Sequence, residues 1–142
     1  MGIDAVYARR ALADLSHWAA YLRDLGPLSA GDLAADLTRQ LAVLHALQLA
    51  IQTCLDLGAH LLAGIGAAPA GEYSSVGPEL AVRGLIPTDL GGRLGQMARF
   101  RNILVHHYRD INLEIVVANL VAGLPDFDEF AGSIIAFLER PA

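Results

Sequence analysis

The sequence contains no lysine. All ten of its basic residues are arginines, and fifteen acidic residues give it a formal net charge of −5. A negative net charge argues against broad, non-specific binding to nucleic acid, whose phosphate backbone repels it. The single cysteine, Cys54, excludes a disulfide within the chain and a zinc site made of several cysteines. We therefore expect a cytoplasmic protein in which Cys54 is a small packed hydrophobe.

Long apolar runs without polar residues are absent as well. The longest uncharged run in the central part of the chain, residues 40–55, holds three glutamines and a histidine between Arg39 and Asp56. A membrane-spanning helix needs about twenty predominantly apolar residues. No apolar segment of the kind found in signal peptides follows Arg9 and Arg10. We expect neither a membrane span nor a signal peptide.

Alternation of apolar and polar residues with period two is also missing, while glycine and proline fall between stretches of helical periodicity. The pattern predicts an all-α fold, a single domain over residues 1–142 built as an antiparallel bundle of about five helices. The expected helices cover residues 4–24, residues 29–65 with a break near Asp36, residues 76–84, a helix opened by Pro87, Thr88 and Asp89, and a last helix from Asn112 that is interrupted or kinked at residues 123–125 and resumes over residues 127–140. Gly26 and Pro27 close the first helix, and Ser29 with Asp32 caps the second.

Apolar residues are abundant, at 54% of the chain. Residues 37–62 carry them in two stripes at helical spacing, which predicts the central and most buried helix. A polar stripe also runs along this helix: His45, Gln48, Gln52, Asp56 and His60. Three interpretations stay open: a metal site at Asp56 and His60 with further ligands, satisfied buried polar groups, or the wall of a cleft where Asp56 pairs with Arg101. The surplus of apolar residues also predicts a homodimer.

A basic region stands out in this acidic chain. From Leu90 through Arg109 there is no acidic residue, whereas four arginines and two histidines fall there. The arginines are Arg93, Arg99, Arg101 and Arg109. A local basic patch of this size matches a small or transient anionic substrate better than a long duplex.

Arg101, His106 and Tyr108 combine three complementary chemistries at the end of the helix opened by Pro87. Arginine binds phosphate with a planar fork, histidine exchanges protons near neutral pH, and the tyrosine hydroxyl both donates and accepts hydrogen bonds. On a helix, Arg101 lies about 20° from Leu90, inside an apolar face, and His106 points about 140° away from Arg101. The two side chains therefore meet at one phosphate if the helix unwinds before His106, or if they come from two subunits related by a two-fold axis.

Less specific interpretations exist for the same residues. Arg101 and His106 are also typical of a helix C-terminus, where cations complement the helix dipole, and Tyr108 suits the packing of any helical bundle. After Pro125, the acidic residues at positions 126, 128 and 129 are typical of an N-cap and a first helical turn.

The spacing of Arg101, His106 and Tyr108, with Asn102 directly after the arginine, resembles the RX4HXY motif of the HEPN superfamily. Within that superfamily it is most similar to the HepT-like toxins, which are paired with minimal nucleotidyltransferase (MNT) antitoxins. The resemblance extends to the long helix at residues 41–66, the segment at residues 72–108 and the closing helix that ends in PDFDEFAGSIIAFLER. An isolated RX4H pattern recurs in many proteins, whereas the full motif within this order of helices is specific.

The resemblance implies a metal-independent endoribonuclease that works as a homodimer, with Arg101 and His106 as catalytic residues in a composite cleft. By role, Arg101 would bind the scissile phosphate and stabilise its developing charge, and His106 would act as general base or general acid. Asn102 and Tyr108 would orient the substrate. We assign no metal and no cofactor, and the expected substrate is RNA, with tRNA as one candidate.

The resemblance also implies a partner, a cognate MNT-type nucleotidyltransferase antitoxin that adenylylates Tyr108 and so fills the cleft with an anion. His107 occupies the variable position of the motif and is given no role. Two other functions stay open. One is a non-catalytic nucleotide-binding or docking subunit of a nucleotidyltransferase complex, and the other is a purely structural interaction module.

Overall fold

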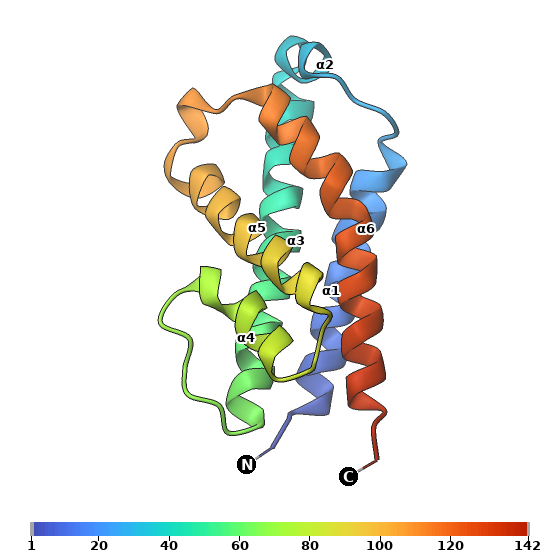
Figure 1. Cartoon of the computed structure of the whole chain (residues 1–142). Helices are drawn as coiled ribbons and strands as arrows, with labels where there is room; N and C mark the ends of the chain where they lie inside the picture. The colour runs from blue at the N-terminus through green and yellow to red at the C-terminus, as the bar shows by residue number, and fades with distance from the viewer. Residues whose placement is uncertain (1, 142) are drawn as a thin grey trace.

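Helices account for the regular structure of residues 2–141, which are the residues that the computed structural model describes. Within this range the chain forms six α-helices, two short 3₁₀ helices and no strand (Figure 1). In order they are α1 (Ala5–Asp24), α2 (Ala30–Ala35), α3 (Leu37–Gly64), η1 (Tyr73–Ser75), α4 (Val76–Val82), α5 (Thr88–His106), η2 (Tyr108–Asp110) and α6 (Leu113–Leu138). Figure 1 shows both ends of the chain at one end of the bundle, opposite α2. The predicted all-α bundle is confirmed.

Local sequence signals set several helix boundaries. The side chain of Asp4 accepts a backbone hydrogen bond from the first turn of α1 and caps that helix. Ser29 and Asp32 form the predicted capping box at the start of α2. Asp36 adopts an extended backbone conformation that separates α2 from α3, and its side chain caps α3 by accepting from the Arg39 amide. The predicted break near Asp36 is therefore confirmed.

The central position predicted for residues 37–62 belongs to α3. Twelve of its residues are buried, and it contacts α1, α4, α5 and α6. Cys54 lies among the buried residues, and burial raises the pKa of its thiol. Among the described helices, α3 alone is long and apolar enough to cross a membrane by length and composition, but 56% of its most apolar window is buried in the bundle. This helix forms the core, as predicted.

Glycines allow α4 and α5 to approach each other closely. A Cβ on Gly77 of α4 would lie 2.5 Å from the carbonyl oxygen of Gly91, and a Cβ on Gly91 would lie 2.8 Å from that of Gly77. A Cβ on Gly95, one turn further along α5, would lie 3.2 Å from the carbonyl oxygen of Ser74. The missing side chains therefore let η1 and α4 pack directly on the α5 backbone. This packing carries Tyr73, the first residue of η1, toward the C-terminal half of α5.

The last helix differs from the prediction. α6 is helical without interruption from Leu113 to Leu138, although Pro125 lies inside it, and Figure 1 shows its ribbon changing direction in the middle. A proline inside a helix costs about 3 kcal/mol. Buried side chains on both sides of it, such as Leu120 and Phe127, hold the helix on the core, and each contributes about 2 kcal/mol. Of the predicted interruption or kink at residues 123–125, the interruption is wrong because this packing outweighs the effect of the proline, whereas the change of direction in Figure 1 agrees with a kink.

Candidate functional site

Arg101 lies in the last part of α5 and is half-buried. Its Nε donates a hydrogen bond to Oε1 of Gln52 on α3 (2.6 Å), and its Nη1 donates to Oδ1 of Asn102 (3.1 Å). The ring of Tyr73 lies against the guanidinium, with the ring centroid 5.3 Å from Cζ, within cation–π range. All three partners are neutral. The guanidinium is therefore held in place while its positive charge is kept.

A second set of contacts fixes Gln52 itself. Its Nε2 donates to the hydroxyl of Tyr73 (2.8 Å) and to Oδ1 of Asp56 (2.9 Å), and the Tyr73 hydroxyl donates to the same Asp56 oxygen (2.8 Å). The hydrogen bond to Asp56, together with burial, raises the pKa of Tyr73, so the hydroxyl remains a donor. The predicted direct pair between Asp56 and Arg101 is wrong. Gln52, one helical turn earlier on α3, lies between them and makes the contact.

His106 is exposed in the last turn of α5. The helix does not unwind before this residue, because the backbone N–H of His107 donates to the carbonyl oxygen of Ile103 (2.9 Å) and ends the helix only after His106. One of the two ways in which Arg101 and His106 could converge is therefore wrong. Five residues along an unbroken helix separate two side chains by about 140°. Within one subunit, the two side chains leave the helix in different directions.

Tyr108 lies beyond α5, which ends two residues earlier. It belongs to η2 and is 55% exposed. Its side chain lines a groove of about 500 Å³ between the first half of α3 and the end of α5. Leu41, His45, Gln48 and Arg109 line the same groove. The tyrosine hydroxyl and a positive charge thus share an open groove that is also lined by leucines.

The polar stripe of α3 divides among three places. His60 holds the start of α1: its Nε2 accepts a hydrogen bond from the Asp4 amide (3.3 Å), and its ring centroid lies 4.3 Å from that of Tyr7. The other members of the stripe belong either to the contacts that hold Arg101 or to the groove at Tyr108. Within residues 2–141, no group of three or more His, Cys, Asp or Glu side chains is placed to hold a metal ion. The stripe therefore serves packing, the setting of Arg101 and the groove wall.

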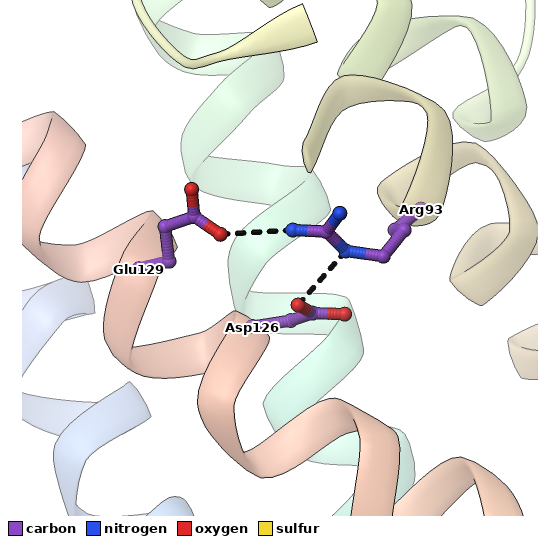
Figure 2. Close-up of polar contacts among 3 residues, drawn as sticks. All are labelled: Arg93, Asp126 and Glu129. Carbon is purple, nitrogen blue, oxygen red and sulfur yellow. Dashed lines mark hydrogen bonds and ion pairs between the residues drawn. The ribbon is translucent and has the colours of Figure 1, made fainter. Parts of the chain in front are cut away.

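Arg93, which the sequence places in the basic region, differs from Arg101. Figure 2 shows its guanidinium between two carboxylates of α6: Nε donates to Oδ1 of Asp126 (2.9 Å) and Nη2 donates to Oε1 of Glu129 (2.8 Å). Asp126 is buried. The charge of Arg93 is therefore neutralised within the fold, and the basic patch is smaller than the sequence predicts.

The sequence predicts that the acidic residues after Pro125 form the N-cap and first turn of a separate helix. That prediction is wrong because α6 is continuous at this point. Asp128 instead pairs with Arg23 of α1 (2.9 Å), while its two acidic neighbours in the cluster bind Arg93. The cluster fastens α6 to α1 and α5.

A family model described as ribonuclease HepT-like matches residues 15–134 of the chain. The chain belongs to the HepT-like family. The mRNA nuclease HepT of Shewanella oneidensis is 33% identical over 105 residues, which cover 71% of this chain and 76% of that protein. The region matched by the family model contains Arg101, His106 and Tyr108, together with the whole of α3.

Solved structures share the fold of this HepT-like chain. A tri-AMPylated HEPN toxin of Shewanella oneidensis in complex with its MNT antitoxin aligns with a TM-score of 0.82 at 26% identity, covering 92% of this chain and 97% of that one. The cytosolic protein YutE of Bacillus subtilis, of unknown function, aligns with a TM-score of 0.82 at 20% identity, covering 96% of this chain and 92% of that one. The resemblance indicated by the RX4HXY motif is confirmed at the level of family and fold.

The HepT-like motif alone did not reveal Tyr73 as a partner of Arg101. Tyr73 follows a loop after α3 and is distant in sequence from both Gln52 and Arg101, so no helical spacing connects the three. One signal was present in the sequence. Gln52 and Asp56, four residues apart, belong to the polar stripe of a largely buried helix, and polar groups that are removed from solvent require hydrogen-bond partners.

Proposed function

We propose that this HepT-like protein is an endoribonuclease in which Arg101 of one subunit and His106 of another act on the same RNA phosphate. The observation that carries the proposal is the setting of Arg101, a half-buried guanidinium held by neutral groups on a helix that runs unbroken to His106. Membership of the family and the nuclease name of the Shewanella oneidensis relative support the class of reaction.

Arg101 is the proposed phosphate-binding group. A guanidinium has five N–H donors, of which Nε–H is used by Gln52 and one hydrogen of Nη1 by Asn102. The donors not engaged by described residues are two on Nη2 and one on Nη1, and phosphate oxygens accept pairs of such donors in a planar fork. At this position the guanidinium would also stabilise the negative charge that develops on the phosphate in the transition state.

His106 is the proposed proton-transfer group. Its neutral imidazole takes the proton of a ribose 2′-hydroxyl, whose oxygen bonds to phosphorus while the bond from phosphorus to the 5′-oxygen breaks. Water then gives the leaving 5′-oxygen its proton. When a protonated His106 acts as the acid instead, it gives the proton to the leaving oxygen and water takes the proton of the 2′-hydroxyl. The products are a cyclic phosphate and a 5′-hydroxyl, and neither proton transfer requires a metal ion.

A second copy of the chain brings the two catalytic groups together. On one helix they diverge by about 140°, whereas a two-fold axis beside the end of α5 allows Arg101 of one subunit to approach His106 of the other. Ile103 of α5 suits such a contact, because this apolar side chain is 42% exposed and does not line the groove at Tyr108. We therefore assign the homodimer contact to the surface of α5 around Ile103.

Tyr108 is the proposed point of control. Its exposure in the groove makes the hydroxyl accessible to a modifying enzyme. The Shewanella oneidensis toxin was solved in a tri-AMPylated form with an MNT antitoxin, and we infer that a cognate antitoxin of this type adenylylates Tyr108. The added phosphate would lie beside Arg109 and oppose the binding of RNA. In the unmodified protein, Tyr108 and Asn102 orient the substrate, and we expect toxin and antitoxin to act in the cytoplasm.

A second candidate function is a non-catalytic subunit that binds a nucleotide or docks a nucleotidyltransferase. The groove beside the exposed Tyr108 favours it, because a groove of about 500 Å³ with a tyrosine and an arginine in its wall suits a nucleotide. This function requires Tyr108 and Arg109. It does not require His106, and that difference separates the two candidates.

The test is cleavage of total tRNA and of a generic messenger RNA in EDTA by wild type, Arg101→Ala and His106→Ala. Arg99→Ala is the matched control, since Arg99 is an exposed arginine on the same helix. Each variant is checked for helicity and dimerisation, and mass spectrometry confirms that Tyr108 is unmodified. We expect cleavage by wild type and the control, and none by the other two. Absence of cleavage by folded, unmodified wild type would favour the binding subunit.

A further inference from the structure

We propose that Gln52 is a positioning residue, a neutral spacer through which Asp56 and Tyr73 orient Arg101 without cancelling its charge. The inference concerns how Arg101 is prepared to bind phosphate, and its effect on RNA cleavage rests on the proposed ribonuclease function. Gln52 lies outside the RX4HXY motif, on a different helix from Arg101.

The hydrogen bonds leave Gln52 only one orientation that satisfies every partner. Both hydrogens of Nε2 are used, one by the Tyr73 hydroxyl and the other by Oδ1 of Asp56. The amide oxygen must then face the other way, where it accepts from Nε of Arg101 at 2.6 Å. Because Tyr73 also donates to Asp56, three half-buried side chains form a closed set of contacts. The negative charge of Asp56 thus orients the amide rather than contacting the arginine.

The same contacts determine which edge of Arg101 is presented to a ligand. Gln52 occupies the Nε edge, and the ring of Tyr73 lies against the guanidinium, 5.3 Å from Cζ. Asn102 takes one hydrogen of Nη1. Both hydrogens of Nη2 and one hydrogen of Nη1 are not engaged by the described residues, so these donors remain for a ligand. A fixed donor pair loses less freedom when it binds an oxyanion than a mobile arginine does.

A carboxylate at position 52 would neutralise Arg101, as the surroundings of Arg93, which lies on α5 like Arg101, show. There the guanidinium lies between two carboxylates and is neutralised (Figure 2). An amide has nearly the shape of a carboxylate and accepts the same hydrogen bond, but it brings no charge. Gln52 therefore provides the orientation that a carboxylate would provide and leaves the attraction for a phosphate intact.

The test compares Gln52→Glu with Gln52→Met, which keeps a similar length but accepts no comparable hydrogen bond. Gln96→Glu is the control for charge, because Gln96 is an exposed glutamine of α5. Tyr73→Phe is the milder variant: it keeps the ring beside Arg101 and removes the hydroxyl that orients the amide. Circular dichroism and melting establish that each protein is folded, and Tyr73→Phe keeps the test valid if a substitution of Gln52 prevents folding.

The first measurement is direct and independent of cleavage. The Nε–H signal of Arg101 in ¹⁵N-labelled protein, assigned with Arg101→Ala, reports its hydrogen bond, and inorganic phosphate is titrated against it. We expect slow solvent exchange of this proton in wild type and faster exchange in Gln52→Met and Tyr73→Phe. Phosphate affinity should fall about tenfold or more in Gln52→Glu and stay at the wild-type value in Gln96→Glu, because only the former places a carboxylate on the guanidinium.

The second measurement is the split between KM and kcat for RNA cleavage. Gln52→Glu should mainly raise KM by about tenfold, and Gln52→Met should mainly lower kcat by a similar factor, because it loses orientation and keeps charge. Equal phosphate affinity in wild type and Gln52→Glu would overturn the inference. Loss of cleavage in Arg101→Ala with normal cleavage in all Gln52 and Tyr73 variants would also overturn it, while supporting the ribonuclease. If the phosphate titrations give the predicted results but wild type does not cleave RNA, the positioning role of Gln52 is supported and the ribonuclease function is contradicted.

Discussion

Two of the arginines on α5, Arg93 and Arg101, lie eight residues apart in opposite surroundings. Arg93 ends between the carboxylates of Asp126 and Glu129, the first of which is buried (Figure 2). Arg101 ends on the amide oxygens of Gln52 and a neighbouring asparagine, beside an aromatic ring. The charge of Arg93 is neutralised by these carboxylates, and the ion pairs join α5 to α6. The charge of Arg101 remains.

The partners, and not the arginine, decide what each position does. An arginine paired with carboxylates inside a helical bundle fixes one helix on another. An arginine held by neutral groups remains able to attract an anion. Substitutions at the two positions should therefore separate the effect on activity from the effect on stability.

The largest expected effect is on cleavage by Arg101→Ala. Removing a charge that stabilises the transition state should lower the single-turnover cleavage rate by about 100-fold to 1000-fold. The free energy of unfolding should fall by about 1–2 kcal/mol, since two hydrogen bonds that are not fully buried are lost. Rapid-quench cleavage and urea unfolding of the same preparation measure both quantities. A rate within threefold of wild type would remove Arg101 from the catalytic site.

Arg93→Met should show the opposite result. It leaves the buried carboxylate of Asp126 without its partner, so we expect the free energy of unfolding to fall by about 2 kcal/mol. The folded variant should cleave RNA at the wild-type rate. The double variant Arg93→Met with Asp126→Leu should recover most of the loss, because both members of the pair are then apolar. If the single variant Arg93→Met were as stable as wild type in urea, the pair of Arg93 and Asp126 would not hold α5 on α6.

A smaller effect is expected on the titration of Tyr73. The hydrogen bond to Asp56, then burial, raises the pKa of Tyr73, and Asp56→Asn should lower it toward the ordinary value for tyrosine. Because the protonated phenol is favoured by the fold, its contribution to stability is present below the ordinary tyrosine pKa and is lost as the pH rises through the raised value. NMR of tyrosine labelled with ¹³C at Cζ, assigned with Tyr73→Phe, follows the titration. The same pKa in both proteins would show that Asp56 does not orient the hydroxyl.

The smallest effect is expected at the pair between Arg23 and Asp128, whose side chains are 49% and 66% exposed. An exposed ion pair contributes little, so Arg23→Ala should lower the free energy of unfolding by less than about 1 kcal/mol. Chemical unfolding at low and high salt provides the measurement, with a still smaller difference at high salt. A loss as large as that at Arg93 would mean that burial of the carboxylate does not explain the difference between the two pairs.

Features set by neighbouring residues were predictable from the sequence. The capping box at Ser29 and Asp32 and the break at Asp36 depend on hydrogen bonds between residues a few positions apart. The burial of α3 followed from apolar residues at helical spacing. The pairing of Arg93 with Asp126 was not predictable in this way, because the partners come from different helices and meet only through packing.

The candidate site was predictable in its residue types and less so in its contacts. The spacing from Arg101 to Tyr108 indicated the family, which is confirmed. The partner of Arg101 proved to be Gln52 rather than Asp56, a choice that depends on one helical turn and on where Tyr73 is carried by the packing of η1. The catalytic roles of Arg101 and His106 stay predictions, because they depend on contacts between two copies of the chain.

The most direct test of the composite site mixes two inactive proteins. Arg101→Ala and His106→Ala subunits are combined under conditions of subunit exchange, with heterodimers quantified by native mass spectrometry. In a heterodimer, one cleft has both catalytic residues intact and the other has neither. The mixture should therefore recover about a quarter of wild-type RNA cleavage, since half of the dimers are mixed and each has one working cleft. Complete exchange without recovered cleavage would contradict a site shared between subunits.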